Sequence, residues 1–292
     1  MELRDLEYFL AIAREGSITG AAKALHLSQP ALTRQLQLLE AELGKPLVHR
    51  GARRITLTED GMLLRRRAEE LLRLAERTRA EIMEPDEQLT GDISVCSGET
   101  KGLHFLTQAA KRLMARHPDV RLHVSSGDTG DVVEELEKGL IDFGLLFAPI
   151  DATRYDYLPV PYEDDLGVIM RKDAPLAQKE HITPEDLIGQ PLIVPRSGNS
   201  TELISHILGL SEEQIRVAGT YSLIFNASLM CADGIGYVLG LDQILNLTGE
   251  SVTCFRPLAP PITARISVVW RRDRPLSRTA QALLDEMRNT GA

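Results

Sequence analysis

Side chains that can read or hold DNA recur at helical spacing near the start of the chain. Gln29, Thr33, Arg34 and Gln37 share one face of a helix that is predicted to begin after Ser28. Gln can read adenine through two hydrogen bonds, Arg can read guanine or hold a phosphate, and Thr can contact a thymine methyl group. On its own such a face is more typical of an ordinary solvated helix, so the interpretation depends on the elements around it.

This face belongs to the last of three closely spaced helical patterns. The first has apolar residues at i, i+3, i+4 and i+7 counted from Leu6, which form one face of a helix. The second covers residues 18–25, and the third begins at the cap residue Ser28 with Pro30 in its first turn, where a missing N–H is harmless. Two helices joined by a turn at residues 26–28 predict a helix-turn-helix, whose second helix enters the major groove. The opposite face of that helix is predicted to point into the core with Leu32, Leu36, Leu39 and Leu43.

A short basic segment follows the third helix. Gly44, Pro46 and Gly51 favour bends there, and Ile55 and Leu57 alternate as in a short strand. Basic groups on such a hairpin suit phosphate or minor-groove contacts, which position a protein on DNA without reading much sequence. The predicted DNA-binding set is therefore Ser28, Gln29, Pro30, Thr33, Arg34, Gln37, Arg50, Arg53 and Arg54.

Residues 59 to about 86 form one long amphipathic pattern that ends at Pro85. Its apolar positions recur at alternating spacings of four and three, which is a heptad seam typical of paired helices. Two such helices side by side would present two recognition helices to two half-sites. The alternative is a helix packed on its own domain. The residues predicted to dimerise are Leu64, Leu71, Ala75 and Ile82.

After Gly91 the strand and helix patterns alternate, which predicts an α/β fold with mostly parallel sheets. Strands are predicted at residues 92–97, 121–126, 142–147, 166–170, 192–194, 235–239 and 265–270. Helices are predicted at residues 103–116, 130–138, 200–208, 222–232, 243–247 and 276–288.

Polar turns at the ends of these strands are candidates for binding a small molecule. Ligands of open α/β sheets bind beyond the carboxyl ends of the strands, and a free helix N-terminus suits an anion. The alternative is that these residues are ordinary helix caps. Glu99 and Asp128 would repel an anion unless Arg196 compensates, so the ligand is expected to carry a hydroxyl or amine as well as a carboxylate. The predicted ligand-binding set is Gly98, Glu99, Thr100, Gly127, Asp128, Phe147, Arg196, Ser197, Asn199, Tyr221 and Ser222.

Charge divides the chain into two unequal parts. Residues 1–67 contain 11 Lys and Arg against 8 Asp and Glu, a net charge of +3, and the remaining residues contain 22 against 34, a net charge of −12. The sequence therefore predicts a mildly basic DNA-binding part joined to an acidic remainder.

No pattern predicts an enzyme or a cofactor. The sequence has no GxSxG, HExxH, GxGxxG or GKT/GKS motif, and its three cysteines have no metal-ligand spacing. We therefore predict no catalytic residues, no metal and no cofactor. The first residues lack an apolar signal-peptide core, and no run of 18 apolar residues occurs, so we expect a cytoplasmic protein without membrane contact.

The first 61 residues resemble the N-terminal domain of the LysR-type transcriptional regulators. The matching residues are Phe9, Gly16-Ser17-Ile18, Ala21-Ala22, Leu25, Ser28-Gln29-Pro30-Ala31, Leu39-Glu40, Leu43-Gly44, Leu47, Arg50 and Leu57-Thr58-Glu59-Asp60-Gly61. This combination is far more specific than a generic helix-turn-helix. The family usually has Phe after the position of Leu47, where this chain has Val48, and that departure affects one core contact.

The resemblance covers the rest of the chain more weakly and implies a multidomain architecture. It consists of an all-α winged helix-turn-helix at residues 1–58, a linker and dimerisation helix at 59–88, and an effector domain at 91–292. That effector domain would be an α/β, periplasmic-binding-protein-like fold with a cleft between two lobes. Lobe one would be residues 91–161 and 269–292, lobe two residues 162–268, and the crossings would lie near 159–163 and 268–271.

The resemblance also implies a function and partners. The protein is expected to be a sequence-specific DNA-binding regulator, controlled by a small organic acid or related metabolite that binds between the lobes. Its partners would be double-stranded DNA with an interrupted inverted repeat in a promoter, a second copy or three further copies of the chain, and RNA polymerase.

Three other classes of protein fit the sequence less well. A cysteine-based redox sensor is less favoured, because Cys231 and Cys254 have no obvious basic partner and Cys96 lies on a predicted strand. A stand-alone solute-binding protein would not need the N-terminal reader. An architectural DNA protein would not need a two-lobed cleft.

Overall fold

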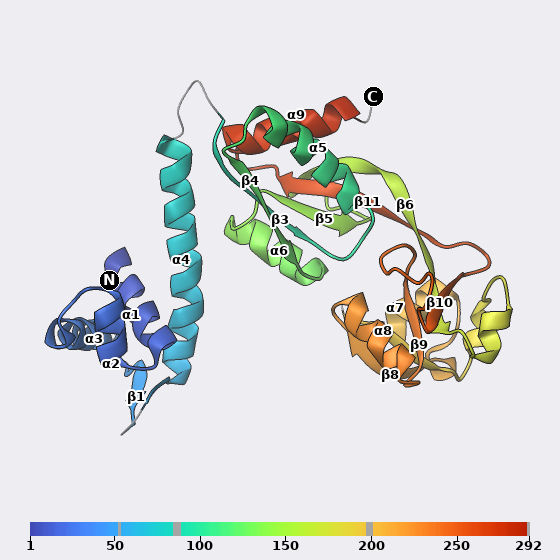
Figure 1. Ribbon diagram of the computed structural model, residues 1–292, viewed down its shortest axis with the longest axis horizontal. Helices are drawn as coiled ribbons and strands as arrows, with labels where there is room; N and C mark the ends of the chain where they lie inside the picture. The colour runs from blue at the N-terminus through green and yellow to red at the C-terminus, as the bar shows by residue number, and fades with distance from the viewer. Residues whose placement is uncertain (52–53, 84–88, 197–200, 291–292) are drawn as a thin grey trace. The chain divides into compact units, whose positions relative to one another are not determined.

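The computed structural model describes residues 1–51, 54–83, 89–196 and 201–290 of the chain. Its contacts divide the chain into two units, Met1–Glu84 and Pro85–Ala292, each with its own hydrophobic core. Figure 1 labels most of the helices and strands of both units.

The first unit is a helical domain with a small hairpin. Its elements are α1 (Leu3–Glu15), α2 (Ile18–Ala24), α3 (Gln29–Leu43), β1 (Val48–Arg50), β2 (Ile55–Leu57) and α4 (Glu59–Met83). Ser17 Oγ accepts a hydrogen bond from the N–H of Gly20 at 3.3 Å, and Ser28 Oγ accepts one from Ala31 at 3.4 Å. Each serine therefore caps the helix that follows it. Strands β1 and β2 pair antiparallel, and we call this hairpin the wing.

The core of this unit forms where the helices pack together. Leu32, Leu36 and Leu39 are buried as the sequence predicts. The expectation for Leu43 is wrong, because its side chain is 40% exposed. Leu43 is the last residue of α3, and Gly44 ends the helix in a left-handed conformation, so this final position extends past the core.

Helix α4 starts close against the wing. The hydroxyl of Thr58 accepts a hydrogen bond from the N–H of Gly61 at 2.9 Å and donates one to the carbonyl of Pro46 at 2.8 Å. A Cβ atom at Gly61 would lie 2.0 Å from the carbonyl oxygen of Leu47. Only glycine permits this approach of helix to backbone.

The predicted seam of α4 divides into two parts. Near its start, α4 packs on α1, where Ala68 is fully buried and Leu64 packs against the core of its own unit. Further along, Ala75 is half-buried, while Leu71 is 42% and Ile82 is 79% exposed. The alternative of a helix packed on its own domain thus describes the first part, and the second part leaves apolar side chains exposed.

The second unit is built on one continuous mixed sheet. Its strands are β3 (Gly91–Ser97), β4 (Val120–Ser126), β5 (Phe143–Phe147), β6 (Tyr155–Arg171), β7 (Pro191–Pro195), β8 (Arg216–Tyr221), β9 (Tyr237–Leu241), β10 (Thr253–Pro257) and β11 (Thr263–Arg271). Its helices are α5 (Leu103–Arg116), α6 (Thr129–Lys138), α7 (Thr201–Leu208), α8 (Ile224–Ala232) and α9 (Arg278–Thr290), with 3-10 turns η1 (Pro175–Gln178), η2 (Pro184–Leu187) and η3 (Glu212–Gln214).

The strand order is β4-β3-β5-β11-β6-β9-β7-β8, and β10 also pairs with β6. Strand β3 runs parallel to β4 and β5, and β7 runs parallel to β8 and β9. The expectation of a mostly parallel sheet is wrong in the middle, because β11 and β6 pair antiparallel with each other and with their outer neighbours.

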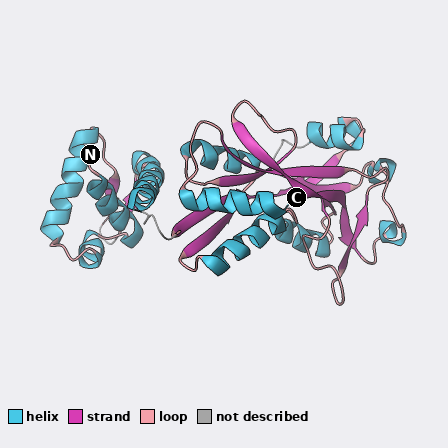
Figure 2. Cartoon of the chain, turned by 90° about the horizontal axis from the view of Figure 1, so that it is seen from above, coloured by secondary structure: helices cyan, strands magenta, loops and turns pink. Residues whose placement is uncertain are grey.

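The sheet carries two lobes, each with helices on both faces. In lobe one, α5 and α9 lie side by side over one face of β3, β4 and β5, and α6 covers the other face (Figures 1 and 2). In lobe two, α7 and α8 cover opposite faces of β7 and β9. Strand β6 joins the lobes, and its pairing with β11 shifts register between Arg265 and Ser267.

In the parts of the chain that the structure describes, no helix is both long enough and apolar enough to cross a membrane.

Candidate DNA-binding face and ligand cavity

Helix α3 presents the predicted reading face to solvent. Gln29, Arg34 and Gln37 are exposed, as is Pro30 in the first turn. Thr33 is half-buried, and its hydroxyl donates to the carbonyl of Gln29 at 2.8 Å. The amide and guanidinium groups of this face therefore extend from a helix whose N-terminus Ser28 holds in place.

The wing is fixed to the end of α1. The N–H of Ile55 donates to the carbonyl of Gly16 at 2.8 Å. The Arg54 side chain lies over Gly16, since a Cβ atom there would be 2.9 Å from Arg54 Nε. Arg53 lies outside the described residues, as does the side chain of Arg50. Of the three wing arginines, Arg54 is thus the one whose placement the structure gives.

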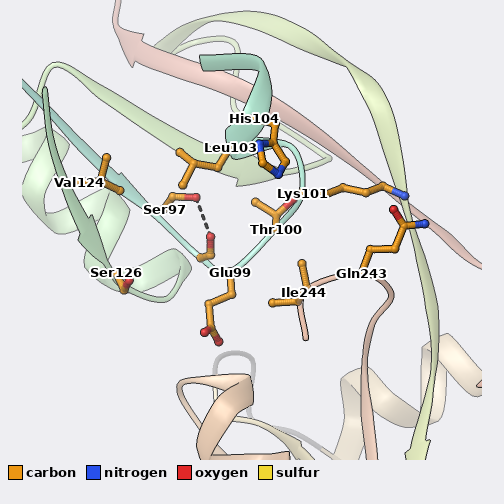
Figure 3. A pocket seen from close by; sticks show the side chains of 11 residues that line it. Ser97, Glu99, Thr100, Lys101, Leu103, His104, Val124, Ser126, Gln243 and Ile244 are labelled. Atoms are coloured by element: carbon orange, nitrogen blue, oxygen red, sulfur yellow. Dashed lines mark hydrogen bonds between the residues drawn. The ribbon is translucent and has the colours of Figure 1, made fainter. Parts of the chain in front are cut away.

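A cavity of about 210 Å³ lies at the carboxyl ends of β3 and β4, where lobe one meets a turn of lobe two (Figure 3). Its walls combine hydroxyl, carboxylate, ammonium and imidazole groups with apolar side chains. The lining residues are Ser97, Gly98, Glu99, Thr100, Lys101, Leu103, His104, Val124 and Ser126 of lobe one, and Gln243 and Ile244 of lobe two.

The structure brings only part of the predicted ligand set into this cavity. Gly98, Glu99 and Thr100 line it. Ser197 and Asn199 lie outside the described residues. The predicted residues that are described but do not line it are Gly127, Asp128, Phe147, Arg196, Tyr221 and Ser222.

The lobe-two wall of the cavity is absent from the sequence prediction. The sequence predicts a helix at residues 243–247, but the structure has a turn there, in which Gln243 has φ +61°. A non-glycine residue in that left-handed region is uncommon. Their position is the sequence signal that could have identified them. Gln243 and Ile244 come shortly after the end of β9, and ligands bind beyond the ends of strands.

Thr100 anchors one wall of the cavity to the strand that joins the lobes. Its hydroxyl donates to the carboxylate of Asp164 on β6 and accepts from the N–H of Gly102 at 2.9 Å. Asp164 is fully buried, and its other oxygen has no hydrogen-bond partner among the described residues. The Lys101 ammonium is 3.9 Å from that oxygen. Burial raises the pKa of the Asp164 carboxyl above its usual range, since the charged form loses its solvation.

The turn of Gly127 and Asp128, between β4 and α6, caps the helix that follows it. Asp128 accepts from the N–H groups of Gly130 at 2.9 Å and Asp131 at 3.2 Å, at the start of α6. Its other oxygen is 3.5 Å from the Arg196 guanidinium of lobe two. At Gly127 a Cβ atom would lie 2.7 Å from the Asp131 side chain, so close packing demands glycine there.

Three further predicted residues lie outside the cavity lining. The Tyr221 hydroxyl donates to the carbonyl of Leu239 at 2.9 Å, and burial together with the charge of Glu99 raises the pKa of that hydroxyl. Phe147, at the end of β5, is 38% exposed. Ser222 is exposed just before α8. The Tyr221 hydroxyl is therefore already bonded within lobe two, while the side chains of Phe147 and Ser222 are exposed to solvent.

Glu99 connects lobe one to the start of α8 in lobe two. Its carboxylate accepts a hydrogen bond from the backbone N–H of Ile224, the first residue of α8. Figure 3 shows this side chain pointing away from Thr100 and Lys101.

The described residues offer little for metal or thiol chemistry. Among them, no group of three or more His, Cys, Asp or Glu side chains could hold a metal ion. Cys96, Cys231 and Cys254 are all buried. Burial raises the pKa of Cys96 and raises that of Cys231 to about 11. Cys231 and Cys254 belong to core clusters on opposite faces of the lobe-two sheet.

Comparison with known proteins finds two family models that together cover nearly the whole chain. Residues 3–62 match the bacterial regulatory helix-turn-helix protein, lysR family. Residues 86–292 match the LysR substrate binding domain.

Individual relatives resemble the chain over its full length. The Hca operon transcriptional activator HcaR of Escherichia coli K12 is 29% identical over 98% of each chain. A hydrogen peroxide-inducible genes activator of Pectobacterium carotovorum is 25% identical over 99% of this chain and 96% of its own length. Among solved structures, CbnR, a LysR family transcriptional regulator, superposes over 100% of both chains with a TM-score of 0.75 at 22% identity.

Proposed function

The chain belongs to the LysR family of transcriptional regulators, and from this premise we propose that a small organic acid, bound in the cavity between the lobes, controls how it binds DNA. The protein is a DNA-binding transcriptional regulator with an N-terminal helix-turn-helix and a C-terminal effector domain. The cavity at the ends of β3 and β4 is the observation that carries the proposal.

The proposed DNA contacts are made by α3 and the wing. Gln29, Arg34 and Gln37 would face base edges in the major groove, and Arg54 would hold the backbone beside it. Two copies of the chain would read the two halves of an interrupted inverted repeat in a promoter. The assembly would be a homodimer or homotetramer, acting on RNA polymerase in the cytoplasm.

The proposed ligand is small and bears both an acid and a hydroxyl or amine group. A cavity of about 210 Å³ falls below the roughly 300–1,000 Å³ typical of drug-sized ligands. Lys101 and His104 can meet a carboxylate, whereas Glu99 favours a donor. Binding and release of such a ligand need no bond-making, so the proposed role is that of a sensor and not an enzyme.

The redox alternative has less support from this chain. Reactive cysteines have lowered pKa values and partial exposure. Here the Cys231 thiol is buried with its pKa raised to about 11. Cys231 and Cys254 also lie in different core clusters of lobe two.

The test is to find the ligand by thermal shift and then block the cavity. The full chain is screened against small hydroxy acids, amino acids and simple carboxylates. A true ligand at a hundredfold excess over its Kd stabilises the fold by about 2.7 kcal/mol. The same ligand is then added to the protein on operator DNA selected from random sequence, and binding is followed by fluorescence anisotropy.

The blocking variant is Ser126→Phe, which places a ring at the cavity wall on β4. It should abolish the thermal shift and the ligand's effect on DNA binding, while leaving ligand-free DNA binding intact. The matched control is His123→Phe, on the opposite face of the same strand. If both variants still respond as the parent does, the ligand does not bind in this cavity.

A further inference from the structure

Helix α8 begins without a cap of its own. The residue before its first turn is Leu223, an apolar residue that offers no side-chain cap, and this fully described helix has no acidic residue in its first turn. The first N–H groups of a helix have no partner within the helix and need an acceptor from elsewhere. Glu99 supplies that acceptor to Ile224 from 125 residues away.

The two ends of this hydrogen bond belong to different lobes. Glu99 lies in the turn after β3 of lobe one, and Ile224 starts α8 of lobe two. A carboxylate at a helix N-terminus gains from both the hydrogen bond and the helix dipole. Another contact between the lobes, Arg196 with Asp128 at 3.5 Å, involves an arginine that is 62% exposed, and exposed ion pairs contribute little. Thr100 also donates to Asp164, on the strand β6 that joins the lobes.

The same carboxylate also lines the ligand cavity. A molecule entering between the lobes therefore meets a group that links them. We infer that Glu99 is a latch that holds the two lobes together. That a bound ligand would meet this latch rests on the proposed function, whereas the contact itself does not.

A simpler role for Glu99 would be to cap α8 without any effect on the lobes. The two roles predict different behaviour when α8 receives a cap of its own. Leu223→Asp supplies one, because an aspartate at that position accepts hydrogen bonds from the next helical N–H groups. The double variant Glu99→Ala/Leu223→Asp therefore has a capped helix and no latch.

The first measurement is hydrogen exchange of the full chain without DNA or ligand, read on a peptide covering residues 222–232. In Glu99→Ala the first amide of α8 should exchange about tenfold faster, as expected for losing a hydrogen bond to a charged group. Glu180→Ala removes one exposed carboxylate elsewhere on lobe two and should leave this peptide unchanged. Equal exchange in Glu99→Ala and the parent would show that the contact does not form in solution and would overturn the latch.

The second measurement is the distance between the lobes, from spin labels at Lys111→Cys on α5 and His206→Cys on α7, both exposed. The native cysteines are buried, and excess unlabelled chain keeps the signal within one molecule. Glu99→Ala should broaden or shift the distance distribution, and Glu99→Ala/Leu223→Asp should remain as broad. If the double variant returns to the parent's distance distribution, Glu99 acts only as a helix cap and the latch is overturned. Because neither measurement uses DNA or ligand, failure of the latch is distinct from failure of the proposed regulation.

Discussion

Single side chains on α3 are proposed to set which DNA this protein prefers. Gln29 and Arg34 are exposed on the same face, beyond a serine cap that fixes the start of the helix. The sequence alone indicates this face because the helical period separates it cleanly from the buried leucines.

Replacing either residue should weaken binding to the selected operator. Arg34→Ala and Gln29→Ala are each expected to cost about 1–3 kcal/mol if the side chain contacts a base, with relaxed preference at that base. Arg4→Ala, which removes the same charge from an exposed position on α1, is the control. Equal losses on operator and random DNA would show that the residue only holds phosphate, and unchanged binding would remove it from the interface.

The buried carboxyl of Asp164 should give the effector domain a distinctive pH dependence. Burial raises its pKa, so the folded protein binds this proton more tightly than the unfolded chain does. Its contribution to stability therefore falls as the pH rises from the ordinary value of 3.8 through the raised folded value. Asp164→Asn keeps an acceptor for Thr100 but carries no charge.

The melting temperature of Asp164→Asn relative to the parent should therefore increase as the pH rises through this window. Asp165→Asn, at the half-exposed neighbouring position, serves as the control. Difference curves that stay flat for Asp164→Asn would mean that this carboxyl does not titrate differently in the folded state.

In the first unit, glycine at one position allows a helix to approach neighbouring backbone closely, whereas another glycine has room for a side chain. A Cβ atom at Gly61 would meet a backbone oxygen, which cannot move aside cheaply, whereas one at Gly20 would lie 3.4 Å from the nearest atom, the Cβ of Glu15. Replacement by alanine is therefore expected to have opposite effects on stability at the two positions.

Gly61→Ala should destabilise the first unit by about 1–3 kcal/mol through overpacking. Gly20→Ala, within α2, should stabilise it by about 0.5–1 kcal/mol, because alanine loses less conformational freedom in a helix. Denaturant unfolding followed by circular dichroism measures both. A Gly61→Ala variant as stable as the parent would mean that the wing and α4 do not meet as described.

Each element that the sequence patterns missed or misassigned has its own physical reason. Strand β8 has almost no buried residues because it lies at the edge of the sheet, so it lacks the alternation that marks a strand. Strand β6 contains Pro159 and Pro161, which argue against a strand, yet they lie where it passes from lobe one towards lobe two. The apolar residues after Gln243 pack into the core from a turn, although their spacing resembles a helix.

At the scale of the whole molecule, assembly is expected to depend on the far part of α4. Leu71 and Ile82 leave apolar surface exposed there, whereas Leu64 packs within its own unit. The seam visible in the sequence could not separate these roles, because the same spacing serves packing on α1 and pairing with another helix.

Changing both exposed residues, Leu71→Asp with Ile82→Asp, should yield monomers in sedimentation and weaken operator binding through loss of the second half-site. The control is Leu3→Asp, which adds charge at another exposed leucine of the same unit. A variant that sediments like the parent would place the main interface elsewhere.

The return of the chain to lobe one has a consequence for how the protein is made. Strand β11 is central between β5 and β6, and α9 completes the core beside α5. During synthesis all helices and strands of the DNA-binding unit are present once residue 83 has left the ribosome. The core of lobe one, in contrast, is incomplete until α9 has been made. A nascent chain is therefore expected to expose β5 and the inner face of α5 on the ribosome until α9 emerges. Chaperones are therefore expected to bind lobe one of the nascent chain and not its DNA-binding unit.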